Sequence, residues 1–262
     1  MKWVCWRVCV LAVVLSLIAL GSAGRASAAG YGAVTGQFVF VGPIPILKPL
    51  VTKGDTVVRD SAVCAKNAVP DESLLVDPAT NGIANVFVYM PKAPSDIHPD
   101  LKTSKEKVVK FDQKGCRFFP HAMLLRTDQT VSVLNDDPIL HNTDVHTFNN
   151  NGQNQTISPN DRDGVKWTFP LPERLATKVN CDIHSWMTAW WLILDHPYAA
   201  VSDKEGRFKI EKIPAGEHEF RIWQEQSGWV FGPKQRSIMV TIKANETTDL
   251  HTMKVPASAF AK

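Results

Sequence analysis

The sequence predicts an all-β protein whose strands form β-sandwiches. Short runs of alternating or β-branched apolar residues recur along the chain, separated by Gly, Pro, Asn and Asp, which is the pattern of antiparallel sandwiches. Beyond the first 28 residues, no segment carries a capped helical stripe of apolar residues over ten positions. Hydrophobic residues make up 44% of the 262 residues, which is enough for a substantial core and excludes a disordered chain.

Nine apolar runs of this kind are the clearest, and each is expected to be a strand. They cover residues 34–41, 83–90, 107–111, 130–135, 165–169, 188–195, 207–210, 218–223 and 237–243. The Asn- and Asp-rich stretch 142–163 is instead expected to be a long loop, and loops of that length are usually functional or mobile.

The N-terminus has the features of a secretory signal peptide, residues 1–28. Lys2 and Arg7 make its start positive, an apolar run follows at 8–20, and an Ala-Ser-Ala tripeptide ending at residue 28 provides the cleavage site. The apolar run is shorter than the roughly 20 residues that span a bilayer as a helix, so cleavage is favoured over an uncleaved anchor. We therefore expect a periplasmic or secreted protein with no membrane span in the mature chain.

The net charge of the mature chain excludes nucleic acid as a partner. The signal carries Lys2, Arg7 and Arg25, three of the 29 basic residues, and none of the 26 acidic ones. The mature chain is therefore formally neutral, and it has no run of like charge. The electrostatic footprint of a nucleic-acid-binding protein is missing.

Three cysteines remain after the signal, which carries Cys5 and Cys9, is removed. An odd number in an exported protein indicates one disulfide and one thiol with another role. Cys64 lies in a polar, loop-like stretch, Cys116 follows a Lys-Gly turn, and Cys181 is surrounded by other residues of metal-ligand type. Although spacing alone leaves the connectivity open, these surroundings favour a Cys64–Cys116 disulfide and a free Cys181.

Four potential metal ligands lie in two short clusters. His141 follows the expected strand 130–135, whereas Cys181, His184 and Met187 form one cluster at three-residue spacing. This set suits copper, because two imidazoles and a thiolate make a trigonal plane that a weak axial thioether completes. On a strand, Cys181 and His184 would point to opposite faces, so this cluster is expected to form a tight turn around an ion.

Several motifs around these ligands match one family. They are Phe118-Phe119-Pro120, the run Thr130-Val131-Ser132-Val133 leading to Asn135, His141-Asn142, and Cys181-x2-His184-x2-Met187. With them, residues from about 105 to 197 resemble a cupredoxin, the blue-copper Greek-key β-sandwich family, and the short ligand loop is most similar to that of amicyanin.

The resemblance implies a site with one type 1 copper ion. His141, Cys181 and His184 would be its equatorial ligands and Met187 its axial ligand. Asn142 would tie the two ligand loops together and donate a hydrogen bond to the thiolate. The resemblance also implies that His184 forms an exposed edge through which the electron passes.

Other interpretations of these residues are weaker. Zinc is the chief rival metal, but a Met ligand argues against it. A Cys/His nucleophilic enzyme is disfavoured, because Cys181 and His184 lie three residues apart in one turn with no readable orienting group or oxyanion motif. His121 and His146 are candidates for an additional metal site, although structural or solvent-exposed roles are favoured for both.

The flanks of this segment are expected to form a second sandwich. After residue 198 come an acidic turn, a Gly, a short strand, a Pro-x-Gly turn and another strand. This meander resembles the carboxypeptidase regulatory-like, or transthyretin-like, β-sandwich, whose first strands are recognisable far upstream. We expect residues 29–94 and 198–262 to form that sandwich, with the cupredoxin domain, residues 95–197, inserted between them. A single enlarged cupredoxin with accessory strands is the alternative.

The sequence therefore predicts an exported blue copper protein that carries single electrons and catalyses no reaction of its own. A protein redox partner is implied, a periplasmic dehydrogenase or oxidase. The alternative is a non-redox module that binds protein or glycan and in which copper is structural or stored.

Overall fold

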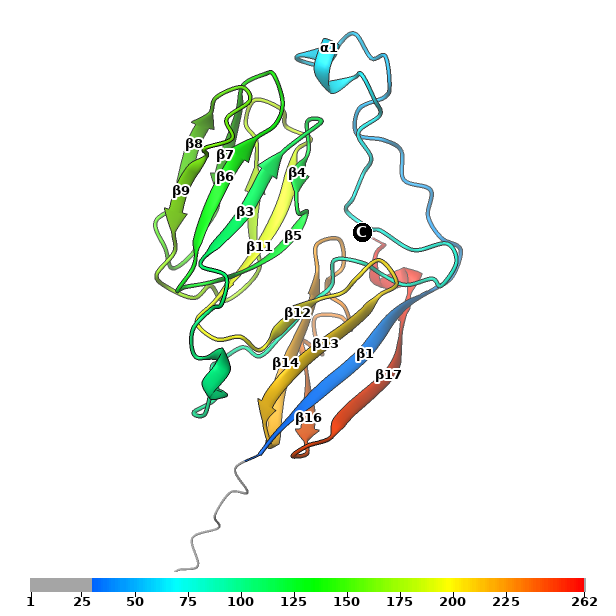
Figure 1. Ribbon diagram of the computed structural model, residues 1–262. Coiled ribbons are helices and arrows are strands. Elements are labelled where there is room, and N and C mark those ends of the chain that lie inside the picture. The colour runs from blue at the N-terminus through cyan, green and yellow to red at the C-terminus, as the bar shows by residue number, and fades with distance from the viewer. Residues whose placement is uncertain (1–29, 262) are drawn as a thin grey trace, which may run out of the picture.

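The computed structural model describes residues 30–261, so the expected signal peptide lies outside the described residues. The all-β prediction is confirmed, because the described chain consists of strands in four sheets, one α-helix of four residues and two 3-10 turns. The strands form two sandwiches, one from the middle of the chain and one from its two flanks (Figure 1). No helix among the described residues is long and apolar enough to cross a membrane.

The flanking segments together build one sandwich. Its strands are β1 (Tyr31–Val41), β2 (Phe87–Tyr89), β12 (Ala199–Val201), β13 (Arg207–Pro214), β14 (Gly216–Gln224), β15 (Gly228–Trp229), β16 (Ser237–Ile242) and β17 (Thr247–Pro256). One sheet has the order β13-β1-β17, and the other has the order β12-β2-β14-β15, with β16 also paired to β14. Phe38 and Ile83 from the first flank share a core with Phe208 and Val240 from the second. A sandwich built from both flanks is therefore present, and its transthyretin-like character stays a prediction.

The middle segment builds the other sandwich. Its strands are β3 (Val108–Gln113), β4 (Phe118–Phe119), β5 (Ala122–Arg126), β6 (Thr130–Asn135), β7 (His141–Val145), β8 (Gln153–Ile157), β9 (Val165–Thr168), β10 (Thr177–Asn180) and β11 (Thr188–Leu194). One sheet has the order β5-β11-β10-β7-β8 and the other β4-β3-β6-β9. Phe111, Val133 and Trp191, all fully buried, lie in the core of this sandwich, where inward-facing apolar side chains are removed from water.

The prediction of a long loop over residues 142–163 is wrong. The segment contains nearly all of β7 and the whole of β8, which pair as an antiparallel hairpin from His141 opposite Ile157 to Val145 opposite Gln153. β8 is the edge strand of its sheet, and most of its side chains are polar and exposed. Such a strand lacks the alternation of apolar residues on which the prediction depended.

A strap, which we define as residues 50–70, leaves the first flank and packs on the middle sandwich. Its base is closed by a β-bridge between Val51 and Val69, and its tip carries helix α1 (Ser61–Cys64). The buried side chains of Val51, Cys64 and Val69 belong to the core of the middle sandwich. In Figure 1 the strap is part of the light-blue to cyan segment that carries α1 and then turns back.

The predicted disulfide is confirmed. Cys64 of the strap is bonded to Cys116 of the middle sandwich, and Cys181 is free and buried. The disulfide therefore fastens the tip of the strap beside the end of the sandwich at which β6 and β10 finish.

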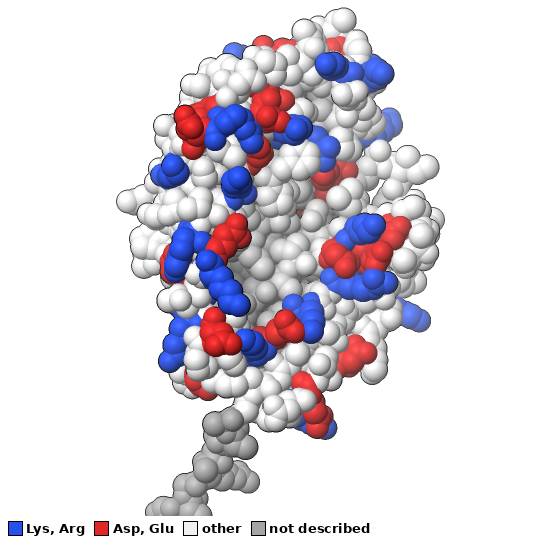
Figure 2. All heavy atoms as spheres, in the orientation of Figure 1, with Lys and Arg blue, Asp and Glu red and all other residues white. Residues whose placement is uncertain are grey.

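The surface in view carries both signs of charge. Figure 2 shows Lys and Arg interspersed with Asp and Glu over this face of the described chain, with no broad area of one sign. This agrees with the neutral mature chain that the sequence predicts.

Candidate metal centre

Three potential ligands meet in the interior of the middle sandwich. His141, Cys181 and His184 each offer one ligand atom within 4.8 Å of the other two. The two Nδ1 atoms of His141 and His184 are 2.9 Å apart, and Sγ of Cys181 is 3.8 Å from Nδ1 of His184. All three side chains are buried, with exposures of 0%, 1% and 0%.

The fold brings the two ligand clusters together through β7 and β10. His141 is the first residue of β7, and Cys181 directly follows β10, which pairs antiparallel with β7. From Cys181 to Met187 the chain turns tightly, because the Cys181 N–H donates to the Met187 carbonyl at 3.2 Å and the Met187 N–H donates to the His184 carbonyl at 2.9 Å. The expected tight turn is thus present between two paired strands.

Asn142 links the two clusters. Its buried side-chain Oδ1 accepts the N–H of Asp182 at 2.7 Å and the N–H of Ile183 at 3.3 Å. The sulfur of Cys181 lies 3.3 Å from the same Oδ1 and accepts the N–H of His184 at 3.4 Å. Asn142, which supplies no ligand atom itself, therefore helps to hold the ligand turn in shape.

The surroundings of Cys181 favour its thiolate. Burial alone would raise the pKa of this thiol, but hydrogen bonds from the rings of His141 and His184 and from two backbone N–H groups lower the pKa to about 6. For His141, burial would lower the pKa, yet the carboxylate of Asp137 and the sulfur of Cys181 raise the pKa above its ordinary value. The sulfur is thus prepared to serve as a soft anionic ligand near neutral pH.

A carboxylate contacts the outer nitrogen of each histidine. Nε2 of His141 lies 3.0 Å from Oδ2 of Asp137, and Nε2 of His184 lies 2.9 Å from Oδ2 of Asp60. With its proton on Nε2, each ring can offer the lone pair of Nδ1 to a metal ion in the space between the rings. No sequence motif marks these two carboxylates as part of the site.

The expectation that His184 forms an exposed edge is wrong. Its side chain is 0% exposed, and Asp60 of the strap contacts its Nε2 at 2.9 Å. The resemblance implied an open edge, but the strap is not one of the motifs that carry the resemblance.

The donor set fits copper better than zinc. A buried free thiol of lowered pKa and two imidazole nitrogens face one another in a buried cluster. Met187 is 2% exposed and follows at the end of the same turn, so a thioether lies in the neighbourhood. A thiolate with two imidazoles and a thioether nearby is the set that copper proteins use. Coordination by Met187 stays a prediction.

The structure does not bring His121 and His146 together. His121 hydrogen-bonds Glu225 through Nε2, and its Nδ1 lies 4.0 Å from Glu72. His146 has a half-exposed side chain that contacts Asn180. Within residues 30–261, neither histidine belongs to a group of three clustered ligand atoms.

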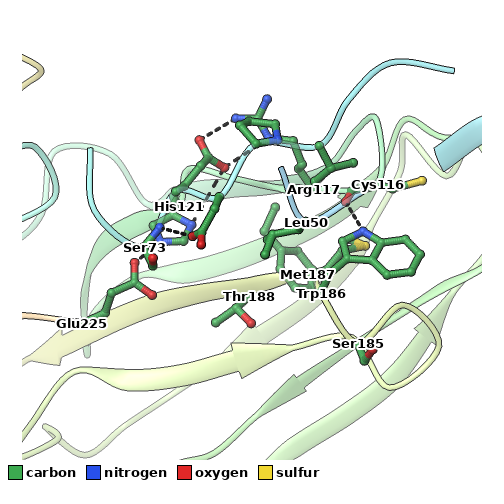
Figure 3. Close-up of a pocket in the computed structure, with 15 residues that line it drawn as sticks. Leu50, Ser73, Cys116, Arg117, His121, Ser185, Trp186, Met187, Thr188 and Glu225 are labelled. Carbon is green, nitrogen blue, oxygen red and sulfur yellow. Dashed lines mark hydrogen bonds and ion pairs between the residues drawn. The ribbon is translucent and has the colours of Figure 1, made fainter. Parts of the chain in front are cut away.

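A cavity of about 320 Å³ lies between the metal-site turn and the flanking sandwich. Met187 and Trp186 line one side, and His121 with Glu225 lines another (Figure 3). The Trp186 indole N–H donates to the carbonyl oxygen of Cys116 at 3.2 Å, so the metal-site turn also contacts the disulfide.

No family model matches the chain, and no curated protein matches it. Solved structures that resemble part of it include cupredoxins. A purple cupredoxin from Nitrosopumilus maritimus is 17% identical over 32% of this chain and 97% of its own, with a TM-score of 0.27. Amicyanin from Paracoccus versutus is 12% identical over 42% of this chain and 98% of its own, with a TM-score of 0.27. A Cu(I) form of an amicyanin variant is 11% identical over 33% of this chain and 82% of its own, with a TM-score of 0.29. At TM-scores this low, the likeness carries no statement about the ligands or the activity of this chain.

Proposed function

We propose that this protein is an exported type 1 copper protein that carries single electrons and catalyses no reaction of its own. The observation that supports the proposal is the buried cluster of His141, Cys181 and His184, whose ligand atoms lie within 4.8 Å of one another. Met187 is the axial ligand in this proposal, and the protein holds one copper ion.

In such a carrier the residues of the chain hold the copper ion in a fixed arrangement of ligands. Bound copper would supply the chemistry, the exchange of one electron between Cu(I) and Cu(II). Soft sulfur ligands favour Cu(I), and imidazole nitrogen ligands favour Cu(II). The protein holds the ligands in one arrangement for both states, and the hydrogen bonds of Asn142 and the buried packing of Cys181 serve that purpose. The geometry of a rigid site changes little when the electron is transferred.

The proposed location and partners follow from the sequence. The features of residues 1–28 support export to the periplasm or beyond the cell. The partner in this proposal is a protein that supplies or accepts single electrons, a dehydrogenase or an oxidase, and the ligand loop similar to that of amicyanin supports this class of partner.

The test is copper loading. Wild-type protein with Cu(II) should show an intense thiolate-to-copper charge-transfer band and the matching EPR signal, and Cys181→Ser should lose both. His146→Gln is the matched control, because His146 is a half-exposed histidine outside the cluster, and the spectra of this variant should equal those of wild type. A wild-type protein without the band would refute the assignment.

One observation favours a second candidate, a module with structural or stored copper. His184 is fully buried beneath Asp60, and a closed site suits retention of a metal. Reversible one-electron cycling distinguishes the two candidates, because a carrier cycles readily and a storage or structural site does not.

A further inference from the structure

Asp60 contacts a residue that lies far from it in the sequence. Its Oδ2 lies 2.9 Å from Nε2 of His184, although the two residues are 124 positions apart. The Asp60 side chain is 38% exposed and that of His184 is 0% exposed. The carboxylate therefore lies between the buried ring and solvent.

The strap holds Asp60 in this place from both ends. The bridge between Val51 and Val69 closes its base, and the disulfide from Cys64 to Cys116 fastens its tip. Asp60 adopts a left-handed backbone conformation with φ of 52° immediately before α1, and its carbonyl accepts the N–H of Cys64 at 3.0 Å. Its position thus depends on a fixed turn rather than on a free loop.

The other histidine of the cluster has an equivalent partner. Asp137 contacts Nε2 of His141 at 3.0 Å, and the same carboxylate accepts the N–H groups of Gly115 at 2.6 Å and Cys116 at 2.8 Å. Asp137 comes from the sandwich itself, only four residues before His141. The Nε2–Oδ2 distances of the two carboxylate–histidine pairs are nearly equal, although one pair is local and the strap supplies the other. This likeness indicates that the second pair is part of the site.

We propose that Asp60 is a positioning residue of the copper centre, and that the disulfide-fastened strap exists in part to deliver it; this rests on the proposed function. Its carboxylate holds the proton on Nε2 of His184, fixes the orientation of the ring and makes Nδ1 a stronger donor. A stronger donor and a nearby negative charge stabilise Cu(II) more than Cu(I). The carboxylate therefore lowers the reduction potential of the site.

Two substitutions separate the charge from the hydrogen bond. Asp60→Asn removes the charge and keeps an acceptor, whereas Asp60→Gly removes both, and both residues tolerate the left-handed backbone at this position. Asp55→Asn is the matched control, because Asp55 lies in the same strap and, among residues 30–261, its side chain accepts only a local N–H, that of Val57.

The first measurement is the reduction potential of the copper-loaded protein. Loss of the hydrogen-bond partner of a metal ligand lowers metal affinity about 10-fold or more. A 10-fold loss confined to Cu(II) raises a one-electron potential by about 59 mV. We expect increases of this order for Asp60→Asn and at least as large for Asp60→Gly. Increases no larger than that of Asp55→Asn would overturn the proposal.

The second measurement needs no copper. In nitrogen-15 NMR spectra of the copper-free protein, the Nε2 proton of His184 should exchange slowly with water in wild type and rapidly in Asp60→Gly. Equal exchange in both proteins would overturn the proposal. A wild-type protein without a charge-transfer band would instead refute the proposed function, and the NMR spectra would still decide whether Asp60 holds His184.

Discussion

Removal of the disulfide should lower the free energy of unfolding by about 4 kcal/mol. Cys64 and Cys116 are 52 positions apart, and a crosslink over a loop of that size reduces the entropy of the unfolded chain by an amount worth about 4 kcal/mol at room temperature. Both cysteines are buried, at 1% and 0% exposure, so replacement of both by Ala adds a small loss of packing in the same direction.

Guanidinium unfolding of the copper-free protein measures this loss. The double variant Cys64→Ala with Cys116→Ala is compared with wild type, and the transitions are followed by circular dichroism and tryptophan fluorescence. Cys181→Ala is the control, since it removes a buried sulfur that closes no loop, and it should cost much less than the double variant. A loss below about 1 kcal/mol, or one equal to that of the control, would refute the view that the disulfide staples the strap to the sandwich.

Three further predictions concern the site and its surroundings. Asn142→Ala leaves the N–H groups of Asp182 and Ile183 without their acceptor. This should lower the free energy of unfolding of the copper-free protein by about 3 kcal/mol, and a loss below about 0.5 kcal/mol would contradict the prediction. For His121, burial would lower the pKa, but Glu225 raises it above its ordinary value, so this contact stabilises the fold fully below about pH 6.5 and is lost as the pH rises through the folded pKa. From about pH 6 to about pH 9, the free energy of unfolding should therefore change less with pH in Glu225→Gln than in wild type. An equal change in both proteins would count against the contact. Met187→Leu, which nearly conserves side-chain volume, should raise the reduction potential while the charge-transfer band remains; an unchanged potential would argue against an axial thioether.

Much of the fold and of the central cluster could be predicted because the signals are local. The expected strand 130–135 corresponds to β6, Thr130–Asn135, since its apolar residues alternate in a regular pattern. The disulfide between Cys64 and Cys116 is confirmed. It could be predicted because only three cysteines lie beyond residue 28 and the residues of metal-ligand type around Cys181 set that cysteine apart. The three residues His141, Cys181 and His184 meet, and this could be predicted because their chemistry and spacing suit one ion.

What the sequence did not predict depends on contacts between distant segments. Asp60 has no neighbouring motif, and its contact with His184 exists only because the strap folds back over the middle sandwich. Glu225 lies in the second flank, yet it contacts His121 of the middle sandwich. The edge strand β8 was missed for another reason, because its polar exposed face resembles a loop in sequence. Local pattern and propensity carry no information about such tertiary contacts.

Reversible electrochemistry of the copper-loaded protein tests the central claim most directly. If the cluster of His141, Cys181 and His184 is a one-electron carrier site, reduction should take up one electron per copper and bleach the charge-transfer band. Reoxidation should restore the band fully, with copper retained through repeated cycles. Release of copper on reduction, or the absence of a reversible one-electron wave from a protein that has bound copper, would contradict the account and favour stored or structural copper.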